Sequence, residues 1–266
     1  MSMLKHPDGS RIYYRLTGKD GDGAPLVLIH GWCSNQSLWE HQVRYFRRRH
    51  PILLLDRRGH GRSSTSGSGH DAAGHAEDIA AVVKAAGLKR VVAVGHAGGA
   101  AGTLEFVRAN PRLVRAGIIV DSFLYPLPRL DDPKSAFGAL LGPMIRALEG
   151  PNARSEFKRW YTSYFHPRSD RQLTRKIVAE AAKTPQAVKL AELHGMVADT
   201  EAIAAGIAQP MLWVTGGFGA GGTDQSYIAR HLKKVGFAQV YGASHFPHFE
   251  QPAQVNAMIE TFLSRL

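Results

Sequence analysis

Histidine and acidic side chains gather in five polar turns of this sequence, most of them containing glycine. Imidazole and carboxylate groups transfer protons near neutral pH, and they also bind metal ions. Four of the turns directly follow a short apolar run, and ligand sites of open α/β sheets form where strands end. The sequence therefore predicts one site assembled from several turns. The turns lie at residues 30–33, 56–63, 95–99, 121–122 and 242–248.

Short, continuous apolar runs predict the strands, at residues 26–29, 52–55, 91–94, 117–120 and 211–214. Such runs are typical of strands buried on both faces in a mostly parallel sheet. The stretches between them have helical character, at about residues 36–46, 75–86, 97–108, 225–235 and 252–263. This alternation predicts an α/β fold with a doubly wound, mostly parallel sheet flanked by helices.

Residues 126–198 interrupt the alternation, because they contain no apolar run of the strand type. The segment consists of helix-like stretches separated by prolines. We interpret it as a helical cap inserted between two strands, above the strand ends. The expected organisation is a core domain formed by residues 1–125 and 199–266, with a cap formed by residues 126–198.

The chain has 33 Lys and Arg residues against 22 Asp and Glu, a formal charge of +11. The densest basic run, residues 44–50, lies at the end of a predicted helix, where cations complement the helix dipole. We interpret the excess as a solubility feature rather than a nucleic-acid site, with an anionic substrate as the other possibility. An apolar fraction of 44% excludes a disordered or fibrous chain.

The single cysteine, Cys33, excludes an intramolecular disulfide and a Cys-based metal site. The known metal-binding spacings and glycine-rich nucleotide loops are absent, so we expect neither a metal nor a nucleotide cofactor. No apolar run approaches the roughly 18 residues of a membrane span, and the first residues lack an apolar leader. These features predict a soluble cytoplasmic protein without a membrane or nucleic-acid partner. They leave the oligomeric state open.

The order of the turn motifs resembles that of the α/β-hydrolase fold over nearly the whole chain. A His-Gly pair follows an early strand, residues 56–63 read Asp-Arg-Arg-Gly-His-Gly-Arg-Ser, and a late turn contains His-Phe-Pro. The resemblance implies that fold, with an inserted helical cap. One motif differs. The nucleophile elbow of the family reads Gly-x-Ser-x-Gly, whereas this chain has Ala97 in the place of the serine, and a methyl group cannot attack a carbonyl.

Three interpretations of Ala97 remain open. The alanine is natural, and the enzyme needs a base but no nucleophile. It is an engineered replacement of a catalytic serine. Or the protein is a non-catalytic receptor for a small molecule. The resemblance places His245 at the general-base position of the family, and a receptor would have no need of that residue.

Two carboxylates could orient His245. Asp121 directly follows the 117–120 run, at an acid position that some members of the family use. Asp224 lies near the commoner acid position, but it follows a glycine-rich loop and precedes a predicted helix, so helix capping is its simpler role. We therefore expect Asp121 to be the partner.

A histidine–aspartate pair without a nucleophile resembles the site of the cofactor-independent 3-hydroxy-4(1H)-quinolone 2,4-dioxygenases, a branch of this superfamily. Those enzymes carry the acid after the same strand, a His-Phe-Pro turn, and a Trp-Cys pair like Trp32 and Cys33. The resemblance implies cleavage of a 2-alkyl-3-hydroxy-4(1H)-quinolone, a quorum signal, by O₂ without any cofactor. The products would be carbon monoxide and an N-acylanthranilate. His245 would remove the 3-hydroxyl proton, and Asp121 would stabilise the imidazolium.

Further residues would surround that small aromatic heterocycle. The backbone amides of Trp32 and Gly98 are expected to stabilise a developing oxyanion. The aromatic stretch around Trp160 either stacks on the flat ring or forms ordinary core. The alternative function is an esterase, lactonase or C–C hydrolase whose serine is replaced by alanine. The residues expected to contact the substrate are His96, Ala97, Trp160 and Cys33.

Overall fold

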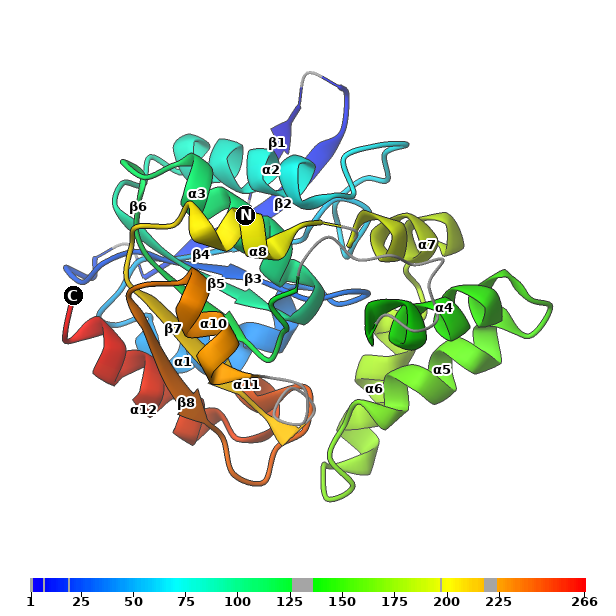
Figure 1. The fold of residues 1–266 in the computed structure, drawn as a ribbon. Helices are drawn as coiled ribbons and strands as arrows, with labels where there is room; N and C mark the ends of the chain where they lie inside the picture. The colour runs from blue at the N-terminus through cyan, green and yellow to red at the C-terminus, as the bar shows by residue number, and fades with distance from the viewer. Residues whose placement is uncertain (1, 7, 19, 126–135, 197, 218–223) are drawn as a thin grey trace.

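A computed structural model of the chain describes every residue except 1, 7, 19, 126–135, 197 and 218–223. It contains an eight-stranded sheet in the order β1-β2-β4-β3-β5-β6-β7-β8 (Figure 1). The strands from β4 to β8 across the sheet are parallel, whereas β2 pairs antiparallel with both β1 and β4. The predicted α/β fold is therefore confirmed. The strands are β1 (Ser2–Lys5), β2 (Arg11–Thr17), β3 (Leu26–Ile29), β4 (Ile52–Leu55), β5 (Val91–His96), β6 (Val114–Val120), β7 (Met211–Thr215) and β8 (Val235–Gln239).

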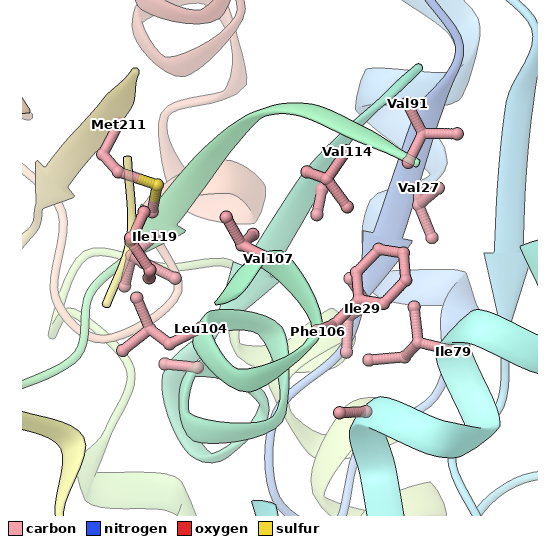
Figure 2. Close-up of a cluster of buried hydrophobic side chains, with 14 of the residues drawn as sticks. Val27, Ile29, Ile79, Val91, Leu104, Phe106, Val107, Val114, Ile119 and Met211 are labelled. Atoms are coloured by element: carbon pink, nitrogen blue, oxygen red, sulfur yellow. The ribbon is translucent and has the colours of Figure 1, made fainter. Parts of the chain in front are cut away.

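Helices cover both faces of the sheet and bury its apolar strands. Ile79 of α2 and Leu104 of α3 pack on one face, as Figure 2 shows. Phe46 of α1 and Ile259 of α12 pack on the other. The two separate apolar clusters explain why the central strands are continuous apolar runs. One face carries α2 (Ala72–Ala85), α3 (Ala100–Ala109), α8 (Thr200–Ala205) and α10 (Gln225–His231), and the other carries α1 (Glu40–Phe46) and α12 (Pro252–Leu263).

Four more helices lie in the described part of the segment that the sequence assigns to a cap, and Figure 1 shows them grouped to one side of the sheet. Met144 of α4, Tyr161 of α5 and Leu193 of α7 belong to one apolar cluster. Trp32 and Phe246, from two of the predicted site turns, belong to the same cluster. The cap helices therefore pack against the strand ends where the site was expected. They are α4 (Ala136–Glu149), α5 (Ala153–Ser163), α6 (Arg171–Ala181) and α7 (Gln186–Gly195).

The edges of the sheet differ from the sequence prediction. β1, β2 and β8 were not predicted, because these strands at or next to the edges of the sheet are only partly buried and mix apolar with polar residues, as in Arg11–Thr17. The helix expected at residues 225–235 ends at His231, and Val235 already begins β8. The helix expected from residue 75 begins at Ala72, because the Asp71 side chain accepts the Gly74 N–H as an N-cap.

Candidate active site

The turn between β5 and α3 has the backbone of a nucleophile elbow without the nucleophile. Ala97, its first residue, has a φ of +46°, a left-handed conformation that strains a residue other than glycine. Gly95 and Gly99 on either side of Ala97 let the turn pack closely against neighbouring segments, and this packing holds the strained backbone in place. A Cβ on Gly95 would lie 2.2 Å from Thr103 Oγ1. One on Gly99 would lie 2.5 Å from the His30 carbonyl oxygen. The motif therefore builds a strained turn and presents a methyl group at its tip.

His245 and Asp121 form a hydrogen bond beside this turn. His245 lies in the loop after β8, and Asp121 directly follows β6. His245 Nδ1 lies 2.7 Å from Asp121 Oδ2, while Asp121 Oδ1 accepts the Gly216 N–H at 2.6 Å. Both oxygens of this fully buried carboxylate are thus fixed. Because a carboxylate accepts hydrogen bonds, the shared proton belongs to Nδ1, and Nε2 carries the lone pair of the neutral ring.

Asp224 serves as a helix cap. Its Oδ1 accepts the backbone N–H groups of Ser226, at 2.9 Å, and of Tyr227, at 3.1 Å, at the start of α10. The Ser226 hydroxyl also donates to Asp224, and these hydrogen bonds lower the pKa of the Asp224 carboxyl. Of the two carboxylates considered from the sequence, the structure pairs Asp121 with His245.

Two buried histidines next to His245 are held neutral. Burial, with the neighbouring His248, lowers the pKa of His96 well below its ordinary value. Burial lowers the pKa of His248 to about 3. His96 Nε2 donates to the main-chain oxygen of His245 at 2.7 Å, which gives the ring a structural role. His96 and His245 both line the pocket described next. Because Nε2 of His96 is already bound to a main-chain oxygen, His245 is the better placed of the two to exchange a proton with a ligand.

A largely apolar pocket lies between the strand ends and the cap helices. It encloses about 810 Å³, its open mouth included. Its polar groups lie at the core side, where His245 and Asp121 meet, while the cap supplies apolar and aromatic walls. This division suits a largely apolar ligand that places a polar group against the core side. The core side contributes His96, Ala97, Gly98, Asp121 and His245, and the cap contributes Leu140, Met144, Tyr161, Tyr164 and Leu193.

The main chains of Trp32 and Gly98 meet at the wall of this pocket. Both residues line it. A Cβ built on Gly98 would lie 3.1 Å from the backbone nitrogen of Trp32. The two segments are thus close enough for both amides to face one oxygen atom, as an oxyanion hole requires.

Trp160 lies outside the described lining of the pocket, so its contact with a substrate stays a prediction that this lining does not support. It borders a separate small cavity with Trp32 and Phe157 instead. The pocket is lined instead by Tyr161 of α5 and by Tyr164, the C-cap residue of that helix, and residues three apart share a face. The spacing of these tyrosines was visible in the aromatic stretch, but the sequence did not show which helix face meets the ligand.

Cys33 also lies outside the described lining, although it follows Trp32 directly. Its φ of +52° directs the side chain into the cap cluster, where it is 1% exposed. It borders a different cavity, with Leu38 and Tyr161. Burial raises the pKa of its thiol well above the ordinary value. Cys33 is therefore buried in the core with an un-ionised thiol, and its predicted contact with a substrate stays a prediction.

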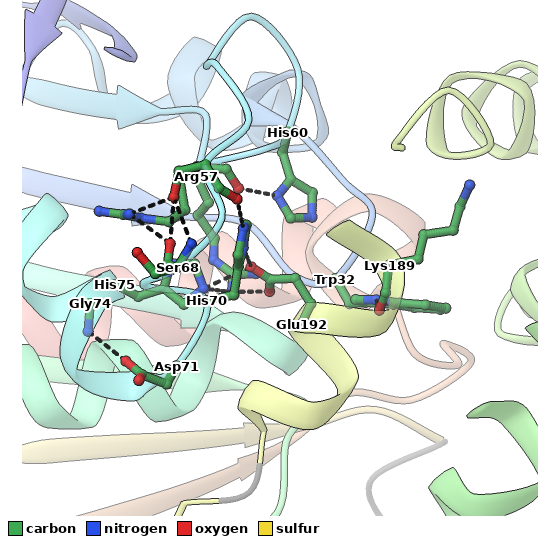
Figure 3. Close-up of polar contacts among 12 residues, drawn as sticks. Trp32, Arg57, His60, Ser68, His70, Asp71, Gly74, His75, Lys189 and Glu192 are labelled. Carbon is green, nitrogen blue, oxygen red and sulfur yellow. Dashed lines mark hydrogen bonds and ion pairs between the residues drawn. The ribbon is translucent and has the colours of Figure 1, made fainter. Parts of the chain in front are cut away.

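A fully buried polar cluster joins cap helix α7 to the core (Figure 3). The Arg57 guanidinium donates to Glu192 Oε2 at 2.5 Å. The other oxygen of Glu192 lies 3.1 Å from His70 Nδ1 and 2.8 Å from His75 Nε2. Burial would raise the pKa of Glu192, but the charge of Arg57 and the histidines hold it well below its usual value. The cap is thus anchored to the core by an ionised carboxylate.

This cluster includes residues of the types that bind metal ions. The ligand atoms of His70, His75 and Glu192 all lie within 4.8 Å of one another. However, Arg57 Nη2 lies 2.7 Å from His75 Nε2 and also contacts Glu192. The guanidinium already stands where a metal ion would have to bind both ligands, and its charge would repel one. The residues present therefore do not fit a metal ion.

Among the helices that the structure describes, none has the length and apolar character to cross a bilayer.

Comparison with curated proteins finds enzymes that share part of this sequence. A non-heme chloroperoxidase of Streptomyces lividans is 35% identical over 124 residues, which cover 46% of this chain and 45% of the relative. A bifunctional esterase/perhydrolase of Acinetobacter calcoaceticus is 33% identical over 129 residues, or 48% and 46% of the two chains. A 2-(acetamidomethylene)succinate hydrolase of Mesorhizobium japonicum is 30% identical over 101 residues, or 38% and 36%. Each match spans less than half of the relative's length.

Solved structures match over almost the entire chain. An enol-lactonase from Burkholderia xenovorans has a TM-score of 0.85 at 16% identity, covering 99% of this chain and 100% of its own. A bromoperoxidase from Bacillus anthracis has a TM-score of 0.86 at 19% identity, covering 99% of both chains. At such low identity these likenesses show the fold alone. A family model described as the alpha/beta hydrolase family matches residues 26–258. The chain belongs to the alpha/beta hydrolase family.

Proposed function

We propose that this protein is an enzyme that works by proton abstraction at His245 and forms no covalent intermediate at residue 97. One observation carries the proposal. The elbow keeps its strained backbone but presents Ala97, while the neighbouring His245–Asp121 hydrogen bond is complete. A base and its orienting carboxylate can activate an acidic proton without any nucleophile.

The reaction proposed for this site is cleavage of a 2-alkyl-3-hydroxy-4(1H)-quinolone by O₂. His245 takes the 3-hydroxyl proton, and the resulting anion supplies the electrons that reduce O₂. One oxygen atom bonds to C2 and the other to C4, and the O–O, C2–C3 and C3–C4 bonds break. C3 then leaves as carbon monoxide, and the two oxygen atoms remain in the N-acylanthranilate. Substrate and O₂ together account for all atoms and electrons of these products, so the reaction consumes no external reductant.

The pocket supports this substrate class through its shape and polarity. Tyr161 and Tyr164 supply aromatic faces, and Leu140 and Met144 supply apolar area for an alkyl chain. The amides of Trp32 and Gly98 would stabilise the negative charge on the ring oxygen. Each donor of this kind contributes about 2.7–4 kcal/mol to a transition state.

Hydrolysis is the second candidate, and the comparisons favour it. The named relatives and structural neighbours include esterases, hydrolases and haloperoxidases, and no dioxygenase is among them. In that case the position of Ala97 belongs to a serine nucleophile, and this chain lacks the group that would form the acyl-enzyme. The base, its carboxylate and the paired amides would otherwise suit acyl transfer.

One variant separates the two candidates. The parent and Ala97→Ser would each be incubated with a 2-alkyl-3-hydroxy-4(1H)-quinolone in air, with O₂ uptake and carbon monoxide release followed together. The same proteins would be assayed with activated aryl esters under nitrogen. For a dioxygenase, we expect quinolone cleavage by the parent and a rate within a few-fold in Ala97→Ser, because the reaction consumes no hydroxyl.

The hydrolytic alternative predicts the opposite pattern. The serine would complete a Ser-His-Asp arrangement, which speeds acyl transfer by orders of magnitude. Strong ester cleavage by Ala97→Ser without O₂, together with no quinolone turnover by the parent, would rule out the dioxygenase. The double variant Ala97→Ser/His245→Ala is the matched control, since it keeps the new hydroxyl and lacks the base.

A further inference from the structure

The loop that carries His245 is fastened to the cap by the carboxylate of Glu250. This residue ends α11 (Pro247–Glu250), the short helix that follows the histidine. Glu250 Oε2 accepts the N–H of Ser244 at 2.7 Å. Glu250 Oε1 accepts the N–H of His166 at 2.5 Å and the hydroxyl of Ser169 at 2.7 Å. One carboxylate therefore joins the residue before His245 to the loop between α5 and α6.

A second set of contacts joins the same two loops. The N–H of His245 donates to the Tyr164 carbonyl at 3.0 Å. The Tyr164 ring also meets the His245 ring edge-on, with 5.1 Å between centroids. Phe165 stacks on Phe246 at a centroid distance of 4.4 Å. The amides of Ser244 and His245 are thus both bound through groups that contact the cap.

We propose that Glu250 is a positioning residue: it links the position of the cap relative to the core to the orientation of the His245 ring. The inference rests on the proposed role of His245 as the base. Asp121 fixes Nδ1 from the core side, but the direction of the ring also depends on the main chain of His245. β8 ends at Gln239, so strand pairing within this sheet stops before the base loop. Glu250 and the Tyr164 carbonyl support the loop from the cap side, while His96, bound to the His245 oxygen, and Gly217, bound to the Ala243 oxygen, support it from the core side.

A carboxylate suits this bridge because of its acceptor capacity. Two ionised oxygens can receive the three donors of Ser244, His166 and Ser169 without conflict. An amide at Glu250 keeps the shape, but its N–H₂ group faces a backbone N–H on one side in either orientation. The variant Glu250→Gln therefore retains the bridge on one side only.

The consequence for catalysis is geometric. The cap supplies Tyr161 and Tyr164 to the pocket wall, so a ligand that packs on them moves with the cap. The Glu250 bridge makes the main chain next to His245 move with the cap as well. The base and the ligand then keep their separation, and a displacement of about 1 Å in such a separation costs roughly 10²-fold in rate.

The test compares Glu250→Gln with Glu260→Gln in the full-length protein. Glu260 lies on α12 and binds Tyr45 and Arg49 at the surface, so it is a matched carboxylate-to-amide control. We expect Glu250→Gln to lower kcat by about 10- to 100-fold. KM should stay within about two-fold, because the pocket walls are unchanged. Glu260→Gln should leave both values at the parent level.

A second readout needs no substrate. The His245 Nδ1–H, bonded to Asp121, gives a downfield proton resonance that His245→Ala identifies by its absence. We expect this resonance to shift or broaden in Glu250→Gln. Ser169→Ala removes one cap-side donor without touching the main chain, and it should cause a smaller change of the same sign. If Glu250→Gln fails to fold, Ser169→Ala provides the test in its place.

Two results would overturn the proposal. One is a folded Glu250→Gln protein with the parent's kcat and the parent's resonance. The other is a loss of thermal stability in Glu250→Gln and Ser169→Ala with the resonance unchanged, which would make the bridge purely structural. If the parent fails to cleave a quinolone but the resonance responds as expected, the proposed function fails while the positioning role of Glu250 stands.

Discussion

The elbow turn (residues 95–99) and the base loop (residues 242–250) lie at the ends of two strands of one sheet, yet they are built in opposite ways. Close backbone packing at its own glycines shapes the elbow, where Gly95 lies against Thr103, Gly99 lies against the His30 carbonyl, and Ala97 adopts a φ of +46°. Distant residues shape the base loop, where His245 binds Asp121 and Glu250 binds His166. The first turn has reactive geometry without a reactive group, and the second has a reactive group whose geometry depends on partners.

The difference shows that the two kinds of site fail in different ways. A strained turn persists only when its surroundings determine it fully, and the close approach of Gly95 to Thr103 does not involve the side chain at the tip. The elbow can therefore lose its nucleophile and keep its shape. The base loop cannot lose Asp121 or Glu250 in the same way, because each one fixes a separate part of it.

The largest effect is expected from removing the base itself. His245→Ala should lower turnover by about 10²- to 10⁴-fold, while far-UV circular dichroism and Tm stay close to those of the parent. The activity of the parent should rise with pH along one limb, because the base acts in its neutral form. Retention of more than about a tenth of the activity would show that another group removes the proton.

A loss almost as large is expected from Asp121→Asn. An amide can still accept the Gly216 N–H, but its N–H₂ group would donate to His245 Nδ1 and move the ring proton to Nε2. A base with the wrong tautomer loses up to about 10⁴-fold in kcat. Nitrogen-15 NMR of the histidine rings, read beside kcat, checks both parts of the prediction. An unchanged tautomer with a full loss of rate would contradict this explanation.

The sequence predicted those features that depend on local patterns. The central strands are buried on both faces, so each is a continuous apolar run, and the motif order then placed the site at their carboxyl ends. Asp121 was predictable as the partner of His245 because it follows β6 without an intervening loop, whereas Asp224 has the surroundings of an N-cap.

Features that depend on packing between distant segments were not predictable. The sequence pointed to Trp160, but the docking of α5 turns Tyr161 and Tyr164 to the pocket. The left-handed φ of Cys33 is a property of the folded turn. Glu192 and Arg57 are 135 residues apart in the chain, and no short motif marks such a pair before the cap is placed on the core.

A smaller effect, of opposite sign, is expected at the tip of the elbow. Ala97→Gly removes the Cβ that makes a φ of +46° unfavourable, a cost of about 1–2 kcal/mol. Glycine also loses more conformational entropy on folding than alanine does, which costs about 0.4–1 kcal/mol of stability. We expect a net gain in the free energy of unfolding of up to about 1 kcal/mol, measured by urea denaturation. Ala81→Gly, in the interior of α2, is the control and should destabilise the protein by about 0.5–1 kcal/mol.

The smallest effect is expected at Asp224, the carboxylate that caps α10 and does not contact His245 in the described structure. Asp224→Ala removes the N-cap of α10 and should lower Tm by a few degrees at pH 7 without changing kcat. Asp224→Asn should keep the parent's Tm, because asparagine caps helices about as well. The hydrogen bonds to Ser226 and Tyr227 lower the pKa of Asp224 in the folded state. The stabilisation by Asp224 is therefore fully present above its pKa in the unfolded chain, and it is lost as the pH falls through its pKa in the folded protein. The Tm difference between the parent and Asp224→Ala should therefore shrink below about pH 4. A fall in kcat for either variant, with Tm unchanged, would instead give Asp224 a place beside His245 during turnover.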